Sequence, residues 1–216
     1  MKPKRKSPFK KGSKELDAEV DPSWTGPRNF FDYGWGYFNA GDLLARTIVN
    51  ALGGKWKGWN LDDESKEYLV GDVYPDVLIF PLLGLYRQGT ELMLKHFIYD
   101  KPNAGAFDED AKKHRLLKLW EQAKQELVNI GFKEDSEECI KVQAFVEKLN
   151  ELDPRGEAVR FPVDYLRNIF FENHAPINIE SIFQEGREVG EILHYIAEGR
   201  NEILSEATEE VTYLEN

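Results

Sequence analysis

The longest apolar run in the chain, VLIFPLLGLYRQGTELMLKHFIY at Val77–Tyr99, constrains the fold most strongly. Its first ten residues carry almost no polar side chain, and a helix that is apolar on all sides is normally buried. Its second half admits Arg87, Glu91 and Lys95, whose spacing of four places them on one face of a helix. A membrane span needs about 20 mostly uncharged apolar residues, whereas these three charges and Pro81 interrupt the run. We therefore expect the central helix of a soluble bundle, with no membrane association.

Helical periodicity of apolar residues predicts four further helices around this run. Ser136 is placed to cap one of them, because the acids Glu137 and Glu138 follow in its first turn. Gly131 is placed to end the helix before it. The predicted helices cover residues 37–52, 108–130, 136–152 and 178–207, and residues 155–176 are expected to be irregular. The fold class we expect is all-α, an up-and-down bundle of about five helices.

Aromatic side chains crowd the chain just before the first of these helices. An aromatic cluster in that place is typical of a lid that packs over the edge of a core. The alternative is a platform on which a nucleotide base stacks. The residues concerned are Phe30, Phe31, Tyr33, Trp35 and Tyr37.

The formal net charge of −11 hides an asymmetry between the N-terminal segment and the rest of the chain. Residues 1–14 hold seven basic side chains and no acid, so the remaining residues carry a net charge of −18. An acidic body is a poor surface for duplex nucleic acid, because neutralising phosphates drives that binding. We expect residues 1–26 to be a disordered basic tail, either solubilising or a non-specific RNA or DNA tether, and residues 27–216 to form a single helical domain.

Cysteine usage and the absence of cofactor motifs narrow the class of protein further. Cys139 is the only cysteine, which excludes an intramolecular disulfide and a cysteine-rich zinc site. A chain of this kind suits the reducing cytoplasm, and no apolar segment follows the basic N-terminus as in a signal peptide. We find no glycine-rich phosphate loop and no metal-ligand spacing, so we expect no cofactor and no metal.

Three segments, in this order, resemble the HEPN-like proteins, a bacterial all-helical family of nucleotide-binding and RNase-type domains. They span about residues 74–165, less than half of the chain, and Gln88 stands where the family pattern has a histidine. The segments are LGLYRQGTELMLKHFI with Tyr86, Arg87, Gln88, Glu91, Leu92, Leu94 and Lys95, KKHRLLKLWEQAK with His114, Leu116, Leu119 and Trp120, and AVRFPVD with Arg160 to Asp164.

Catalytic members of that family are metal-independent RNases that pair an Arg-x(4–6)-His motif across a homodimer. The resemblance implies that arginine holds the scissile phosphate and that histidine moves the proton of the 2′-hydroxyl. Two segments fit the spacing, Arg167 with His174 and Arg187 with His194. A chain with 10 arginines and 4 histidines is expected to contain less than one such match by chance, so two are barely above background, and an exposed helix flank and an irregular loop are the alternatives.

The polar stripe of Arg87, Glu91 and Lys95 also has two interpretations. It lines a pocket near His114 that binds a partner or nucleotide, or it is a ladder of ion pairs that lets the helix reach water at one edge. A buried Glu91 would need a specific partner, and His114 would then make a local polar contact. The resemblance thus implies a metal-independent endoribonuclease, or a toxin- or defence-type RNA-processing protein, acting as a homodimer. The alternatives are a catalytically inactive HEPN-like module that binds a nucleotide or a protein partner, and a purely structural accessory protein.

Overall fold

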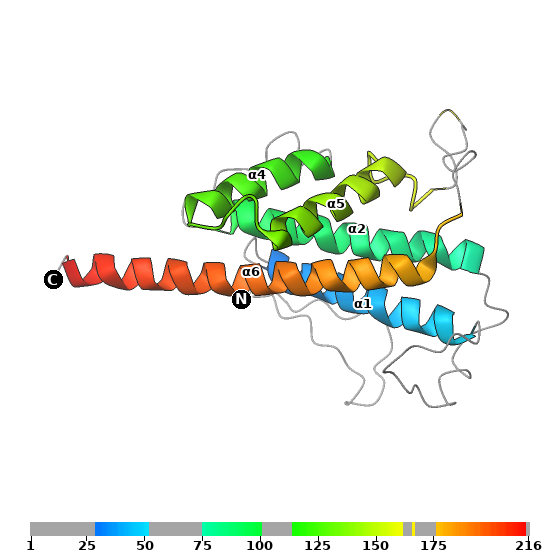
Figure 1. The fold of residues 1–216 in the computed structure, drawn as a ribbon, viewed down its shortest axis with the longest axis horizontal. Coiled ribbons are helices and arrows are strands. Elements are labelled where there is room, and N and C mark those ends of the chain that lie inside the picture. The colour runs from blue at the N-terminus through cyan, green and yellow to red at the C-terminus, as the bar shows by residue number, and fades with distance from the viewer. Residues whose placement is uncertain (1–28, 52–74, 101–113, 162–165, 167–175, 215–216) are drawn as a thin grey trace, which may run out of the picture.

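The computed structural model describes residues 29–51, 75–100, 114–161, 166 and 176–214, and in these parts it is helical (Figure 1). The all-α class is confirmed, with five helices and no strand among the described residues. The predicted basic tail at residues 1–26 lies outside them. The helices are α1 (Phe30–Ala51), α2 (Pro75–Tyr99), α4 (Leu116–Asn129), α5 (Glu137–Leu152) and α6 (Ile179–Leu214).

The helix α2, built from the long apolar run, lies at the centre of the bundle and packs against all four of the others. In Figure 1, α4 and α5 cover one side of α2, while α1 and α6 run along its other side. α6 continues past the other helices toward the C-terminus. Six apolar or aromatic side chains of α2 are at most 2% exposed, as expected for a helix that is apolar on most of its faces: Leu82, Leu83, Tyr86, Met93, Leu94 and Phe97.

Two glycines allow α1 and α2 to approach each other closely. A Cβ atom at Gly34 of α1 would lie 2.9 Å from the side chain of Met93. A Cβ atom at Gly89 of α2 would lie 2.9 Å from the ring of Phe38 and 3.1 Å from the carbonyl of Gly34. Any side chain at either position would push the two helices apart. The glycines at these positions therefore allow α1 to pack directly on α2.

α1 begins at Phe30, seven residues earlier than the sequence pattern predicted. The expected aromatic lid in front of the helix is wrong, because these aromatic residues form the first turns of the helix itself. Phe31 and Trp35 pack against the core, while Tyr33 and Tyr37 are 47% and 37% exposed. Burial of one aromatic face thus outweighs the modest helix propensity of these residues.

The connection between α4 and α5 has the predicted helix stop and start. Gly131 has φ +98°, and the hydroxyl of Ser136 accepts a 3.2 Å hydrogen bond from the backbone N–H of Cys139. α4 begins only at Leu116, because His114 has φ +55° and cannot belong to a right-handed helix. Residues 108–113 of the predicted helix lie outside the described residues.

The last helix is longer than expected, since α6 runs to Leu214 and the pattern predicted an end near residue 207. The irregular segment before it contains turns at 158–160. Its residues 162–165 and 167–175 lie outside the described part. Among the helices whose residues are described, none combines the length and apolarity that crossing a membrane requires.

Candidate functional site

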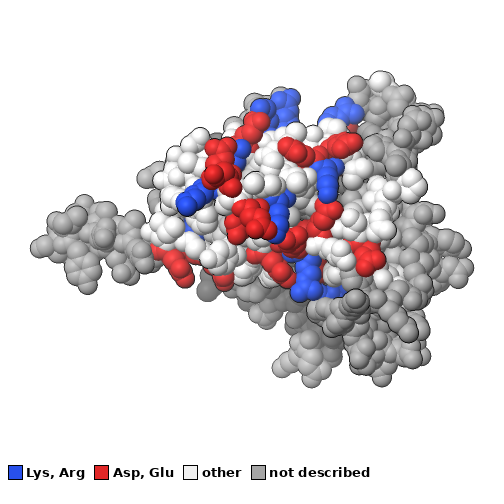
Figure 2. Space-filling model, in the orientation of Figure 1, with Lys and Arg blue, Asp and Glu red and all other residues white. Residues whose placement is uncertain are grey.

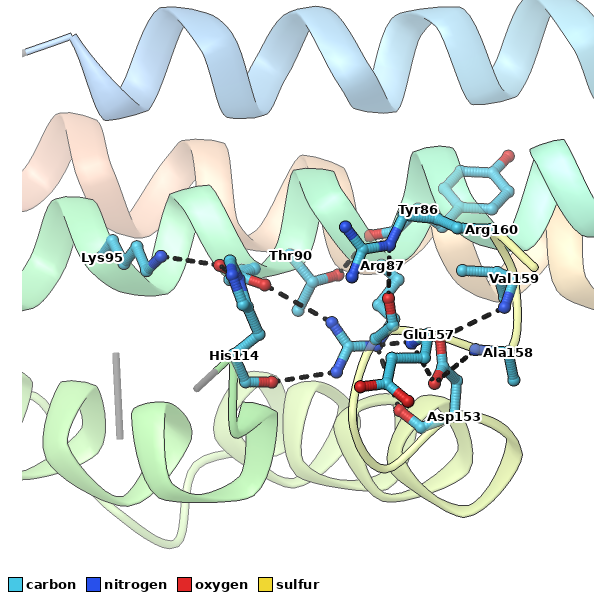
Figure 3. Close-up of polar contacts among 12 residues, drawn as sticks. Tyr86, Arg87, Thr90, Lys95, His114, Asp153, Glu157, Ala158, Val159 and Arg160 are labelled. Atoms are coloured by element: carbon cyan, nitrogen blue, oxygen red, sulfur yellow. Dashed lines mark hydrogen bonds and ion pairs between the residues drawn. The ribbon is translucent and has the colours of Figure 1, made fainter. Parts of the chain in front are cut away.

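The polar stripe on α2 is buried, which corrects the expectation that it reaches water at one edge of the helix. Arg87, Glu91 and Lys95 are 4%, 1% and 7% exposed. Two turns of the chain cover them, one at His114 and the other following Asp153 (Figure 3). Glu91 therefore has the specific partners that a buried carboxylate requires.

The guanidinium group of Arg87 connects α2 to both of these turns. Its Nη2 donates to the carbonyl of His114 at 3.0 Å, and its Nε donates to the carbonyl of Asp153 at 3.2 Å. Its Nη1 donates to Glu91 Oε2 at 3.4 Å. Burial lowers the pKa of Arg87, and the carboxylates of Asp153 and Glu91 oppose that shift. An arginine side chain remains charged under these conditions, so Arg87 keeps its contacts with Glu91 and with the two turns.

Glu91 accepts from two side chains through a single oxygen atom. Lys95 Nζ lies 2.6 Å and His114 Nδ1 lies 2.7 Å from Glu91 Oε1. Burial alone would raise the pKa of Glu91, but the Lys95 ammonium and the contact with His114 outweigh it and lower that pKa. Because an ionised carboxylate can only accept, His114 donates from Nδ1, which fixes the orientation of a ring whose side chain is 44% exposed.

The carboxylate of Asp153 shapes the loop that follows α5. It accepts from three successive backbone N–H groups, those of Glu157 at 2.8 Å, Ala158 at 3.1 Å and Val159 at 3.4 Å. Gly156 within this loop has φ +70°, and a Cβ atom there would lie 2.9 Å from Arg87 Nη1. The loop is therefore held in one conformation by α2 and by its own first residue.

A pocket of about 640 Å³ opens above this network, between the first turn of α4 and the loop after α5. Five of its lining side chains are basic in type and one is acidic, in a chain whose net charge is −11. The lining residues are His114, Arg115, Leu117, Lys118, Asn150, Pro154, Arg155, Glu157 and Arg160. Such a concentration of cations around one cavity is suited to an anion.

Several basic groups of this pocket already have partners within the chain. Lys118 Nζ lies 2.6 Å from Glu121, Arg155 Nε lies 3.6 Å from Glu157, and Arg160 Nε donates to the carbonyl of Gly156 at 2.6 Å. Each guanidinium group has five N–H donors, so one such contact does not exhaust its capacity to bind an oxyanion. These contacts restrict the side chains before a ligand arrives, which reduces the entropy lost on binding.

A second cavity of about 600 Å³ lies between α2, α5 and the start of α6. Its lining is mainly apolar and is formed largely by Leu83, Phe145, Leu149, Leu152, Pro176, Ile177 and Ile182. It does not bring several charged groups of one sign together, so it does not share the chemistry of the basic pocket.

Arg187 and His194 lie on α6, apart from the helices and loop that form the basic pocket. Arg187 Nε donates to Glu191 at 2.9 Å. The ring of His194 rests against Trp35 and Phe31 of α1, with centroids 4.5 and 5.1 Å away, and its Nδ1 lies 3.6 Å from Glu198. This flank of α6 is thus partly covered by α1 of the same chain.

The other candidate pair, Arg167 and His174, lies outside the described residues. The structure does bring His114 together with the polar stripe of α2, as the sequence suggested. The residues are Arg87, Glu91, Lys95 and His114.

Sequence reasoning missed most of the pocket wall. Arg160 entered only as part of the family resemblance, and Arg115, Lys118 and Arg155 were not singled out at all. Two short signals were present: a basic residue at the third position after Arg115, and a second arginine five residues after Arg155. Neither spacing shows that the two segments meet, because they are separated by the whole of α4 and α5.

Within the described ranges, no group of three or more histidine, cysteine, aspartate or glutamate residues is placed to hold a metal ion. Cys139 is buried in α5.

Searches of protein-family models, of curated proteins and of solved structures find no match for this chain. The HEPN-like resemblance therefore rests on the three sequence segments alone.

Proposed function

We propose that this protein is a HEPN-like module that binds the phosphate groups of a nucleotide or of RNA in the basic pocket. The observation that carries the proposal is the convergence of His114, Arg115, Lys118, Arg155 and Arg160 on one cavity of an acidic chain. Arginine and lysine are the side chains that recognise phosphate oxygens through charge-assisted hydrogen bonds. The size of the pocket falls within the range of small-molecule sites.

The buried network on α2 has a supporting role in this proposal. Arg87 and Glu91 hold the turn at His114, and Arg87 also holds the loop that carries Arg155 and Arg160. The polar stripe of α2 does not itself meet the ligand, because its side chains are almost fully buried. It sets the distance between the two walls of the pocket, as a rigid supporting shell does in other binding sites.

The test is direct binding of a fluorescent mononucleotide and of a short single-stranded RNA, measured by polarisation at several salt concentrations. Arg155→Gln and Lys118→Gln are each expected to weaken binding by about tenfold and to reduce its salt dependence. Lys148→Gln is the matched control, since it removes one exposed lysine charge from α5 outside this pocket. Equal binding by the pocket variants and the control would overturn the proposal.

A metal-independent ribonuclease is the second candidate, because Arg187 and His194 share one flank of α6 and both remain partly exposed. The proposal requires a homodimer that pairs two such flanks. RNA incubated with the protein in EDTA is then cleaved, and His194→Ala or His174→Ala abolishes that cleavage. Cleavage that persists in both variants, or no cleavage by the folded wild-type protein, would remove this candidate.

A further inference from the structure

Resting on the proposed function, we infer that the basic pocket takes a terminal phosphate group, a phosphate monoester, in preference to an internal phosphodiester of an RNA chain. Three features of the described structure support this choice: the number of cations that meet in the pocket, the acids beside them, and the fixed imidazole ring at its rim.

The first feature is the number of positive charges around the pocket, which sets how much negative charge on a ligand they can neutralise. Arg115 is the N-cap residue of α4, Lys118 lies in its first turn, and Arg155 and Arg160 come from the facing loop. A phosphate monoester carries between about 1.5 and 2 negative charges at neutral pH and presents three strong acceptor oxygens. An internal diester carries a single charge. Four permanent cations around one cavity therefore match the monoester better than the diester.

The second feature is the acidity of the surroundings. Glu157 lines the pocket itself, and Glu121 sits 2.6 Å from the ammonium of Lys118. Among the residues coloured in Figure 2, basic side chains are interspersed with acidic ones and form no continuous track. An internal diester requires the RNA to leave the pocket in two directions, so flanking phosphates on both sides would face acids. A terminal phosphate needs only one exit.

The third feature is His114, which is preorganised at the rim. His114 adopts φ +55°, an uncommon conformation for a residue other than glycine, and both its carbonyl and its Nδ1 are tied to α2. The imidazole is therefore held in place at the rim before a ligand arrives, so a contact between it and a phosphate costs little further ordering of the ring.

The experiment compares three forms of one short single-stranded RNA that differ only at their ends. One form carries a 5′-phosphate, one carries a 3′-phosphate, and one has hydroxyl groups at both ends, with an internal fluorophore in each. We expect one phosphorylated form to bind wild-type protein about tenfold more tightly than the hydroxyl form. Inorganic phosphate and pyrophosphate are expected to compete for the same site.

The variants Arg155→Gln and Lys118→Gln are expected to bring this preference close to one, and Lys148→Gln is expected to retain it. Thermal unfolding of each variant shows that the comparison is made on folded protein. If all three RNA forms bind equally and the pocket variants weaken them equally, the pocket binds RNA but the inference of a terminal phosphate is wrong. If no form binds and no nucleotide binds, the proposed function itself is wrong.

Discussion

Two sets of ion pairs in this protein share the same helical spacing and differ in their surroundings. On α2, Arg87, Glu91 and Lys95 follow one another at intervals of four, with side chains that are 5%, 1% and 9% exposed. On α5, Lys141 pairs with Glu137 four residues earlier and with Glu188 of α6, and these side chains are 39–77% exposed. Spacing determines which side chains meet, whereas burial determines how much the contact changes the free energy of unfolding.

The largest expected effect of breaking a pair is on the buried set. Glu91→Ala removes the carboxylate that accepts from Lys95 and His114 and one of the two that face Arg87. We expect the free energy of unfolding to fall by about 3–5 kcal/mol, because these buried cations lose a buried carboxylate partner. Urea denaturation followed by circular dichroism measures this change.

Glu188→Ala on α6 is the matched control for that measurement. It removes a glutamate that is 51% exposed and 2.8 Å from Lys141, and we expect a change within about 0.5 kcal/mol. Similar losses in the two variants would show that burial does not separate the two sets of ion pairs.

A smaller effect is expected from the glycine that allows the loop to approach the buried network. In Gly156→Ala, the new side chain must tolerate a backbone φ of +70°, and its Cβ atom would lie near Arg87 Nη1. Glycine has no Cβ atom and avoids both problems. We expect a loss of more than about 1 kcal/mol in the free energy of unfolding. Gly36→Ala is the control, because a Cβ atom there meets nothing within 4 Å and lies in a helix. A stable Gly156→Ala protein would mean that the loop relaxes away from Arg87.

The fold was more predictable than the site, and the reason is physical. Apolar periodicity, the Ser136 cap and the Gly131 stop are local signals, and they correctly predicted the five helices found in the described part of the chain. The spacing of Arg87 and Glu91 is local as well. Their remaining partners, His114 and Asp153, lie 27 and 66 residues from Arg87, and no periodicity reports contacts between turns that are so far apart. Burial of the stripe depends on those turns, so the sequence pattern could not distinguish a buried network from a water-facing ladder.

His96 is a buried titratable group outside that network, and it provides a test through pH. Its ring is 2% exposed, and neither ring nitrogen forms a hydrogen bond within the described residues, although Nδ1 lies 3.0 Å from Asp100 Oδ2. Burial and the nearby Arg200 lower the pKa of His96, while Asp100 and Asp32 oppose that shift. A histidine whose pKa is lower in the folded state binds its proton more readily in the unfolded state.

We therefore expect the stabilising effect of neutral His96 to be complete above its ordinary pKa of 6.5 and to be lost as the pH falls through its lower folded value. Urea denaturation at pH 7.5 and pH 5.5 measures the loss in wild-type protein. His96→Leu is expected to reduce that loss, since leucine does not titrate. An unchanged loss in the variant would assign the acid sensitivity to other groups.

The smallest expected effect belongs to an exposed pair between helices, Lys148 on α5 and Glu185 on α6. Their side chains are 59% and 36% exposed, and Lys148 Nζ lies 2.6 Å from Glu185 Oε2. A double-mutant cycle with Lys148→Ala and Glu185→Ala isolates the interaction from other effects of each substitution. We expect a coupling of about 0.2–1 kcal/mol that declines as salt is added, because solvent screens the two charges. A coupling as large as the Glu91→Ala effect would show that contact distance, which is 2.6 Å here and between Lys95 and Glu91, matters more than burial.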